Sequence, residues 1–215
     1  MTETPNPATR LNALLVESSQ PPLDPFLTQH FDALLSLFLR WNARINLTSI
    51  RDEEGILSRH FVESIACARA LPAGLSTLLD FGSGAGFPGL PIALCRPEIS
   101  VTLAESQGKK AAFLCEAVRV LGLAAEVHSG RAESLATQFD CVTLRAVDKM
   151  DRAIQAAVHL VRQGGWLALM TTNAGLPALK ASAGADFSWT VAPLFPNSDD
   201  RLLALGKRAN QPPSE

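Results

Sequence analysis

The segment STLLDFGSGAGFPGLP, residues 76–91, constrains the fold more than any other part of this chain. An apolar run of strand character ends on Asp80 and then breaks into Gly82, Gly84 and Gly86 at alternating positions. Glycine lets the backbone turn sharply and lets a ligand approach closely, because it has no Cβ atom. A glycine loop between a strand and a helix is typical of α/β folds that bind a nucleoside-containing cofactor. An ordinary glycine-rich turn has the same pattern, so the rest of the chain must decide between the two.

From Ser76 onward, short apolar segments of strand character alternate with helical stretches. The predicted strands cover residues 77–81, 100–104, 124–128, 140–144, 165–170, 187–192 and 201–206. The predicted helices lie near residues 87–95, 108–122, 148–162 and 175–182. This alternation predicts an α/β fold, with a doubly wound parallel sheet covered by helices on both faces. Its ligand should lie at the carboxyl ends of the first strands, where the glycine loop begins.

The residues before this alternation predict a helical N-terminal part. Asp24 and Pro25 have the residue types of an N-cap and of a first helical position. Large apolar residues then recur at steps of four and three, as on one face of a helix: Leu27, Phe31, Leu34, Phe38 and Trp41. A second helix is expected over residues 54–70, before the breaker LPAG. The predicted organisation is a flexible, proline-rich segment at 1–22, a helical extension at 23–74, the sheet domain at 75–210 and a tail at 211–215.

Two carboxylates and one aromatic residue indicate which cofactor the loop holds. Glu105 ends the next strand, 19 positions after Gly86, where a carboxylate can accept both hydroxyl groups of a ribose. Asp80 would lie beside the pyrophosphate of a dinucleotide, and two like charges about 5 Å apart cost roughly 3 kcal/mol at an effective dielectric near 20. Phe87 also stands where the dinucleotide fingerprint has its last glycine. S-adenosylmethionine carries an ammonium and a sulfonium group and no phosphate, so it suits Asp80 better. The alternative for Asp80 is a helix N-cap.

Composition narrows the remaining classes of protein. The net charge is -2 at pH 7, so any binding of nucleic acid must rest on a local basic patch. No apolar run approaches the roughly 18 residues of a membrane span, and the N-terminus lacks the layout of a signal peptide, which favours the cytoplasm. The cysteines are scattered in apolar context, which favours buried free thiols over metal ligands or disulfides: Cys67, Cys95, Cys115 and Cys141. We therefore expect no metal site and no membrane association.

The sequence lacks the motifs that several methyl-transfer reactions require. The fourth strand ends CVTLRAVDK, without the Asn/Asp-Pro-Pro-aromatic box usual for transfer to an exocyclic amine of a base. No cysteine follows a proline, as the nucleophile for cytosine C5 commonly does. Guanine N7 remains a suitable acceptor, because it has a free lone pair at neutral pH and no proton to remove. An enzyme for it need only align N7 with the methyl carbon, and alignment can lower a barrier by on the order of 7–11 kcal/mol.

Several longer segments resemble one protein family. They are WNARINLTSIRDEEGILSRHFVESI at 41–65, DFGSGAGFPGLPIAL at 80–94, RPEISVTLAESQGKKAAFL at 96–114, GRAE at 130–133 and LRAV at 144–147. These segments resemble the bacterial RsmG proteins, also called glucose-inhibited division protein B, which methylate guanine N7 in 16S ribosomal RNA. The resemblance implies a class I S-adenosylmethionine-dependent methyltransferase fold, Rossmann-like, with a seven-stranded, mostly parallel sheet behind a helical N-terminal extension. It also implies 16S ribosomal RNA or the small ribosomal subunit as the partner of a chain that we expect to be a monomer.

The resemblance assigns cofactor contacts to the residues that match the family's motifs. Gly82 and Phe87 would bound the methionine end, Glu105 would take the ribose, and Ala132 with Glu133 would contact the adenine. The full set expected at the cofactor is Asp80, Gly82, Ser83, Gly84, Gly86, Phe87, Glu105, Ser106, Ala132, Glu133 and Arg145.

Three residues are expected at the acceptor. Arg145 ends the fourth strand, where a charge is costly unless it is paired or faces a cleft, so it is either functional or part of a structural ion pair. Asn46 and His60 would line the acceptor cleft according to the family's N-terminal motif. By residue type alone, Asn46 is an ordinary cap or turn residue and His60 an ordinary core or surface histidine. The residues expected to bind RNA are Arg44, Arg59, Lys109 and Lys110, and Arg40, Arg51, Lys207 and Arg208 extend this group.

One departure from the family pattern keeps alternatives open. After the fifth strand the family usually reads leucine-lysine-glycine, and this chain has Met170 and Thr171 there. Another RNA or a small molecule could therefore be the methyl acceptor. An NAD(P)-dependent oxidoreductase is disfavoured by Asp80 and by the missing third glycine. A non-catalytic RNA-binding or assembly protein is disfavoured by the pI of about 6.1 and by the lack of a long basic tract.

Overall fold

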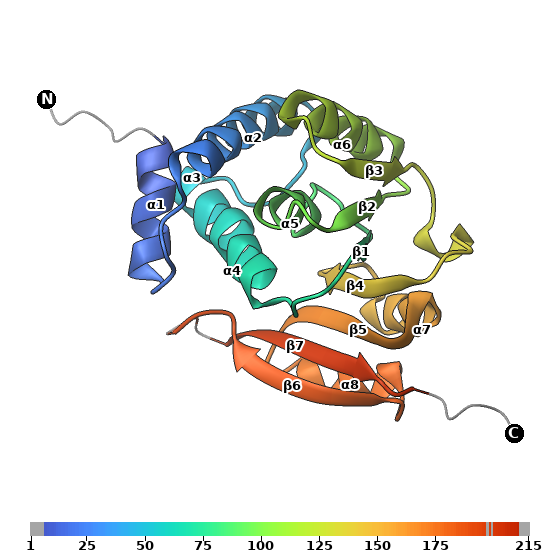
Figure 1. Ribbon diagram of the computed structural model, residues 1–215. Coiled ribbons are helices and arrows are strands. Elements are labelled where there is room, and N and C mark those ends of the chain that lie inside the picture. The colour runs from blue at the N-terminus through green and yellow to red at the C-terminus, as the bar shows by residue number, and fades with distance from the viewer. Residues whose placement is uncertain (1–6, 197, 199, 211–215) are drawn as a thin grey trace, which may run out of the picture.

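Seven strands form one mixed sheet in the computed structural model, which describes residues 7–196, 198 and 200–210 (Figure 1). Along the chain they are β1 (Thr77–Phe81), β2 (Ser100–Ala104), β3 (Ala125–His128), β4 (Phe139–Arg145), β5 (Val161–Thr172), β6 (Phe187–Pro193) and β7 (Arg201–Arg208). Their spatial order is β3-β2-β1-β4-β5-β7-β6. Neighbouring strands from β3 to β5 are parallel, and β7 runs antiparallel to both β5 and β6. The predicted α/β fold with a seven-stranded, mostly parallel sheet is therefore confirmed.

Helices cover both faces of the sheet. Helices α5 (Gly89–Cys95) and α6 (Gly108–Leu121) pack on one face, and α7 (Met150–Leu160) and α8 (Leu176–Ala183) pack on the other (Figure 1). Neighbouring residues of a strand point to opposite faces, so Leu78 belongs to the first core and Leu79 to the second. A 3-10 helix, η2 (Ala132–Ser134), follows β3. The carboxyl ends of β1, β2 and β4 thus meet at one edge, between the two helical layers.

The N-terminal part packs on the first face and is helical, as predicted. Helix α2 (Pro25–Ile45) begins at Asp24, whose side chain accepts a hydrogen bond from the Leu27 N–H group. The expected second helix runs as α3 (Glu53–Ile56), η1 (Leu57–Val62) and α4 (Glu63–Ala70). The middle segment, η1, is a π-helix and carries Arg59 and His60. Because π-helical turns are rare and are frequently found at functional sites, η1 draws attention to these two side chains.

Residues 7–17 correct the prediction of a flexible N-terminal segment. They form helix α1 (Pro7–Glu17), in which Leu11, Leu14 and Leu15 are buried. Arg10 of the same helix forms an ion pair with Glu54 in α3. The prolines of this region suggested a loose chain, but the leucines have the spacing of a helix face and bury against the core. Residues 1–6 and the predicted tail at 211–215 lie outside the described residues.

Three further observations concern membranes, metals and thiols. In the part of the chain that the structure describes, no helix has the length and apolar character needed to cross a lipid bilayer. The same residues contain no group of three or more histidine, cysteine, aspartate or glutamate side chains placed to hold a metal ion. The four cysteines are free thiols, and Cys67 and Cys141 are buried. Burial of all four was expected, which is wrong for the exposed Cys115 of α6.

Candidate functional site

The glycine loop joins β1 to α5 with the backbone geometry that its sequence predicts. Gly82 and Gly86 have φ angles of 70° and 83°, which residues with a side chain rarely adopt. A Cβ atom at Gly86 would also lie 2.4 Å from Cδ1 of Leu90 in α5. Both the backbone angle and the close packing of α5 therefore require glycine at this position.

Asp80 lies beneath the loop and is 1% exposed. Its Oδ2 accepts a hydrogen bond from the N–H group of Gly89 at 3.1 Å, and its Oδ1 accepts one from the Thr143 hydroxyl at 2.8 Å. Burial raises the pKa of Asp80 to about 6, and the hydrogen bonds from Thr143 and Gly89 oppose that rise. Because Gly89 is the first residue of α5, these contacts resemble the capping alternative, with the cap supplied by the preceding strand. A contact between Asp80 and the cofactor stays a prediction.

Glu105 ties the loop after β1 to the loop after β2. Its Oε2 accepts a hydrogen bond from the Gly84 N–H group at 2.8 Å, and its Oε1 accepts one from the Gln107 N–H group at 2.6 Å. The residue is 6% exposed. A carboxylate offers about four acceptor sites, so these two bonds leave lone pairs on both oxygens for the predicted ribose hydroxyls.

A cavity of about 440 Å³ opens at the carboxyl ends of β1, β2 and β4. Four of the expected cofactor residues line it: Gly82, Ser106, Ala132 and Glu133. The sequence analysis assigned no contact to the other lining residues, which are Phe81, Ala104, Gln107, Gly130, Arg131, Val147, Asp148, Lys149, Arg152 and Ala153. Small-molecule sites commonly measure about 300–1,000 Å³ and combine apolar walls with a few polar groups. The residues present therefore fit a nucleoside-containing cofactor. A second hollow of about 570 Å³ shares Glu133, and its lining contains no residue of the glycine loop.

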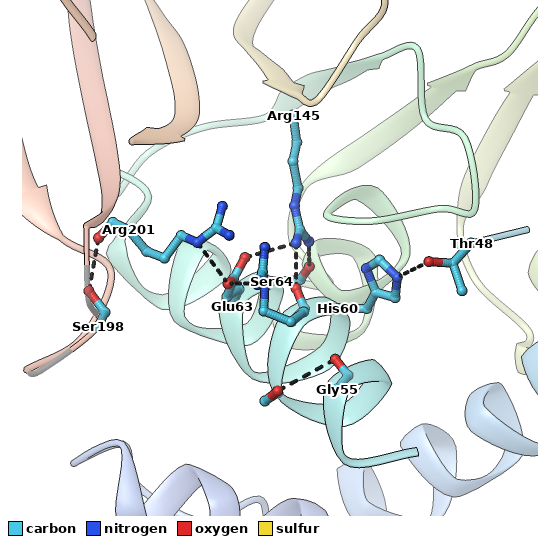
Figure 2. Close-up of polar contacts among 10 residues, drawn as sticks. Thr48, Gly55, His60, Glu63, Ser64, Arg145, Ser198 and Arg201 are labelled. Carbon is cyan, nitrogen blue, oxygen red and sulfur yellow. Dashed lines mark hydrogen bonds and ion pairs between the residues drawn. The ribbon is translucent and has the colours of Figure 1, made fainter. Parts of the chain in front are cut away.

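Arg145 belongs to a cluster of charges that joins three distant segments (Figure 2). Its Nη2 lies 2.8 Å from Oε2 of Glu63 and donates a hydrogen bond to the Arg59 carbonyl, and its Nη1 donates one to the Ser64 hydroxyl. Arg59 and Arg201 approach the other oxygen of Glu63 at 3.3 Å and 3.8 Å. Burial raises the pKa of Glu63, and the guanidinium groups of Arg145 and Arg59 act against that rise. The structural ion pair considered for Arg145 is thus present, and the cluster sets three guanidinium groups against one carboxylate.

His60 lies between this cluster and the glycine loop. Its ring stacks on Phe87, with centroids 5.0 Å apart and an angle of 16° between the planes. Its Nε2 lies 2.8 Å from Oγ1 of Thr48 (Figure 2). Burial, followed by the charges of Arg145 and Arg59, lowers the pKa of His60 to about 4. The ring is therefore neutral at neutral pH.

Asn46 has more ordinary surroundings. It is the C-cap of α2, with a left-handed φ of 52°, and its side-chain oxygen accepts a hydrogen bond from Arg51 at 3.1 Å. The residue is exposed, and these contacts match the cap that its residue type suggests. A role for Asn46 at the acceptor stays a prediction.

The basic residues expected to bind RNA lie in two regions. Arg44 lies in the last turn of α2 and Arg59 in η1, and both are exposed. Lys109 and Lys110 lie in the first turn of α6, with Lys109 exposed. Two residues of the extended group make packing contacts, Lys207 over the Trp166 ring and Arg208 to the carbonyl oxygens of Val158 and Val161.

Sequence reasoning missed Glu63 and Arg201. The signal for Glu63 was its place inside the apolar run HFVESIA, where an unpaired carboxylate would be costly. No comparable signal marks Arg201, because its approach to Glu63 depends on the pairing of β7 with β5. The structure also places Met170 directly opposite Arg145 across β4 and β5, and Met170 is 6% exposed. A lysine at this position would bring a further positive charge beside Arg145.

Comparison with known sequences identifies relatives along most of the chain. Residues 27–185 match the family GidB, described as rRNA small subunit methyltransferase G. Ribosomal RNA small subunit methyltransferase G of Stenotrophomonas maltophilia (strain K279a) is 41% identical over 173 residues, which cover 79% of this chain and 81% of that protein. The protein of the same name from Roseiflexus sp. (strain RS-1) is 47% identical over 132 residues. That match covers 58% of this chain and 56% of the relative, so it spans just over half of the relative's length.

Comparison with solved structures concerns the fold. The crystal structure of cofactor-bound Rv0187 from MTB has a TM-score of 0.64 and 20% sequence identity, over 97% of this chain and 100% of that one. At this level of identity the likeness shows a shared fold, which includes the N-terminal helices as well as the sheet.

Proposed function

The chain belongs to the rRNA small subunit methyltransferase G family, and from that membership we propose that it methylates N7 of a specific guanine in 16S ribosomal RNA. It is an S-adenosylmethionine-dependent rRNA methyltransferase. When bound, S-adenosylmethionine supplies an electrophilic methyl group on a sulfonium centre. The residues of this chain bind that cofactor, hold the guanine against it and exclude water.

One observation carries the choice of N7 as the acceptor atom. Among the described residues around the site, each buried acidic or basic side chain already accepts hydrogen bonds, is ion-paired or is neutral. Asp80 and Glu105 accept backbone hydrogen bonds, Glu63 is paired with arginines, and the pKa of His60 is lowered to about 4. A site without a free general base suits an acceptor that has a lone pair and no proton to lose. Guanine N7 is such an atom, and its reaction depends on alignment.

The cofactor occupies the cavity beside the glycine loop in this proposal. Gly82, Ser106, Ala132 and Glu133 line that cavity. The family's motif adds contacts from Asp80, Ser83, Gly84, Gly86, Phe87, Glu105 and Arg145. In this proposal the acceptor guanine contacts His60, whose ring stacks on Phe87, and Arg145. The family's motif adds Asn46 to the residues expected at the acceptor. The two reactants thus approach each other across the end of β4.

The RNA lies over the N-terminal helices and the start of α6. Arg44, Arg59, Lys109 and Lys110 contact its phosphates, so binding weakens as salt rises. The chain acts as a monomer in the cytoplasm, where the small ribosomal subunit is found.

One observation favours a second candidate acceptor. Met170 is buried opposite Arg145, at the position where the family pattern has a lysine. The loss of that positive charge changes the surroundings of the acceptor more than those of the cofactor. Methyl transfer to another RNA, or to a small molecule, is the alternative that this difference supports.

A methylation assay tests the proposal and separates the two acceptors. Small ribosomal subunits, naked 16S ribosomal RNA and total small RNA from cells that lack this gene would be incubated with the protein and labelled S-adenosylmethionine. We expect N7-methylguanosine at a single site of 16S ribosomal RNA, and loss of label with the Glu105→Ala variant. Label in another RNA would favour the alternative acceptor. Tight cofactor binding without label in any RNA would contradict the proposed function.

A further inference from the structure

The second ring nitrogen of His60 is a buried atom that the contacts described above leave unexplained. Among the described residues, Nδ1 of His60 is the one buried side-chain nitrogen or oxygen without a hydrogen-bond partner. Buried polar atoms in native proteins are almost always paired, and an exception calls for a specific explanation. A ligand that completes the pair on binding is one such explanation.

The hydroxyl group of Thr48 is the described partner of Nε2 in His60, and its other contacts favour one tautomer of the ring. Oγ1 of Thr48 accepts a hydrogen bond from the N–H group of Ile50 at 3.2 Å and lies 2.8 Å from Nε2 of His60. The hydroxyl proton can serve one acceptor, and Nε2 is the acceptor that the described contacts offer it. When Thr48 donates to Nε2, the neutral ring must carry its own proton on Nδ1. The unpaired Nδ1 is then a donor.

Thr48 and the imidazole ring are both held in place. The backbone N–H group of Thr48 donates to Oδ1 of Asn42 in α2 at 3.1 Å. The ring of His60 lies against Phe87, and Phe38 approaches it from another side with centroids 6.0 Å apart. The donor direction of Nδ1 is therefore fixed before any ligand arrives, which lowers the entropy cost of forming a hydrogen bond.

The charges around His60 select the kind of ligand atom. Arg145 and Arg59 are close enough to disfavour a positive charge on the ring. Figure 2 shows His60 between Thr48 and the guanidinium group of Arg145. A ligand atom near Nδ1 thus meets an N–H donor inside a positive field. An oxygen with negative charge or exposed lone pairs is favoured there, and a second donor is disfavoured.

We propose that Thr48 is a positioning residue that holds His60 as the Nδ1–H tautomer, so that Nδ1 donates a hydrogen bond to an oxygen of a bound reactant. This inference rests on the proposed function, which supplies two such oxygens. One is O6 of the acceptor guanine, which lies on the same edge of the base as N7. The other is the carboxylate of S-adenosylmethionine. If O6 is the partner, the contact also rejects adenine, because adenine presents an amino donor at that position.

Nitrogen-15 NMR of the histidine rings tests the tautomer without any methylation assay. The full chain would be labelled on histidine, and the His60→Gln variant would assign the His60 signals. We expect wild-type His60 to show a protonated Nδ1 and an unprotonated Nε2, and Thr48→Ser to keep this pattern. Thr48→Val should move the proton to Nε2, with the other histidine signals unchanged as a check on folding. A wild-type ring that carries its proton on Nε2 would overturn the inference, as would an unchanged tautomer in Thr48→Val.

Two activity measurements then identify the oxygen. One is the single-turnover rate of methylation of small ribosomal subunits at saturating S-adenosylmethionine, and the other is the affinity for S-adenosylhomocysteine by calorimetry. A rate at least tenfold lower in Thr48→Val, with unchanged affinity, assigns the bond to guanine O6. An affinity at least tenfold lower assigns it to the cofactor carboxylate. Wild-type values of both in Thr48→Val would overturn the inference. A wild-type protein that methylates no small subunit would instead contradict the proposed function, and the NMR result would still stand.

Discussion

The two halves of the site hold their buried carboxylates in different ways. On the cofactor side, Asp80 and Glu105 accept backbone hydrogen bonds from residues 84–107 and one from the Thr143 hydroxyl. On the proposed acceptor side, Glu63 is held by guanidinium groups from η1, β4 and β7. The backbone donors lie within one stretch of chain, whereas two of the three guanidinium groups, those of Arg145 and Arg201, reach Glu63 only after distant segments have packed. The carboxylates of the proposed cofactor half are thus held mainly by nearby backbone groups, and the carboxylate of the proposed acceptor half mainly by side chains from distant strands.

The largest effect is expected from removing the main cation of the acceptor half. The Arg145→Met substitution leaves the Glu63 carboxylate, 3% exposed, without its nearest partner. Breaking a buried pair by removing one member typically costs about 3–5 kcal/mol, and the lower end of this range applies here because Arg59 and Arg201 still approach Glu63 at 3.3 Å and 3.8 Å. We expect a decrease of this size in the free energy of unfolding, measured by urea denaturation.

Two control variants sharpen this result. The double substitution Glu63→Gln with Arg145→Met should recover most of the lost stability, because it removes the buried carboxylate as well. Arg131→Met, which breaks an exposed ion pair with Glu133, should change stability far less. If Arg145→Met were as stable as Arg131→Met, the charged cluster would not hold the acceptor half together.

The pH dependence of stability should have opposite signs in the two halves. The pKa of His60 is lowered from 6.5 to about 4, so its contribution is present above about pH 6.5 and is lost as the pH falls towards 4. The pKa of Asp80 is raised from 3.8 to about 6, so its contribution is present below about pH 3.8 and is lost as the pH rises through 6. When the pH falls from about 7.5 to about 5, the His60 contribution lowers the free energy of unfolding by about 2 kcal/mol, and the Asp80 contribution raises it by about 1.4 kcal/mol.

Two substitutions separate these opposed contributions. Relative to the wild type, His60→Gln should gain stability on acidification, because it keeps only the Asp80 contribution. Asp80→Asn should lose stability for the converse reason. Urea denaturation of the three proteins at the two pH values measures both slopes, and the other titratable groups cancel in the comparison. Parallel slopes in all three proteins would mean that neither group is as strongly perturbed as its burial implies.

The same contrast explains what could be predicted from the sequence. β1 and β2 were predicted with their correct limits, and the glycine loop and Glu105 were found, because all of these depend on neighbouring residues. The approach of Arg201 to Glu63 depends on the register of β7 against β5, which no local pattern records. The prediction for helix α1 failed for a different reason. The prolines at both ends of the segment suggested a flexible chain, although its leucines have the spacing of a helix face. Features that depend on neighbouring residues could thus be predicted from the sequence, and side-chain contacts that depend on tertiary packing could not.

A smaller effect is expected from one side chain of the cofactor half. Glu105→Ala removes the acceptor expected for the ribose hydroxyls and also frees the N–H groups of Gly84 and Gln107. The affinity for S-adenosylhomocysteine should fall at least tenfold, equivalent to about 1.4 kcal/mol. Calorimetry measures this value, and Glu126→Ala, which removes an exposed carboxylate from β3, is the matched control. Equal affinities of Glu105→Ala and the control would place the cofactor elsewhere.

The smallest effect concerns the RNA and asks whether it spans both halves. Lys109 and Lys110 begin α6 on the cofactor side, and Arg44 ends α2 on the acceptor side. Each phosphate contact contributes about 0.7 to the slope of log affinity against log salt for single strands and about 0.9 for duplexes. The Lys109→Ala/Lys110→Ala and Arg44→Ala variants should each bind small ribosomal subunits a few-fold more weakly, with a shallower salt slope than the wild type. Binding measured over a series of salt concentrations gives these slopes. If the salt slope changes with Arg44→Ala and not with Lys109→Ala/Lys110→Ala, the RNA contacts only the proposed acceptor half. Helix α6 would then contribute to cofactor binding and not to RNA binding.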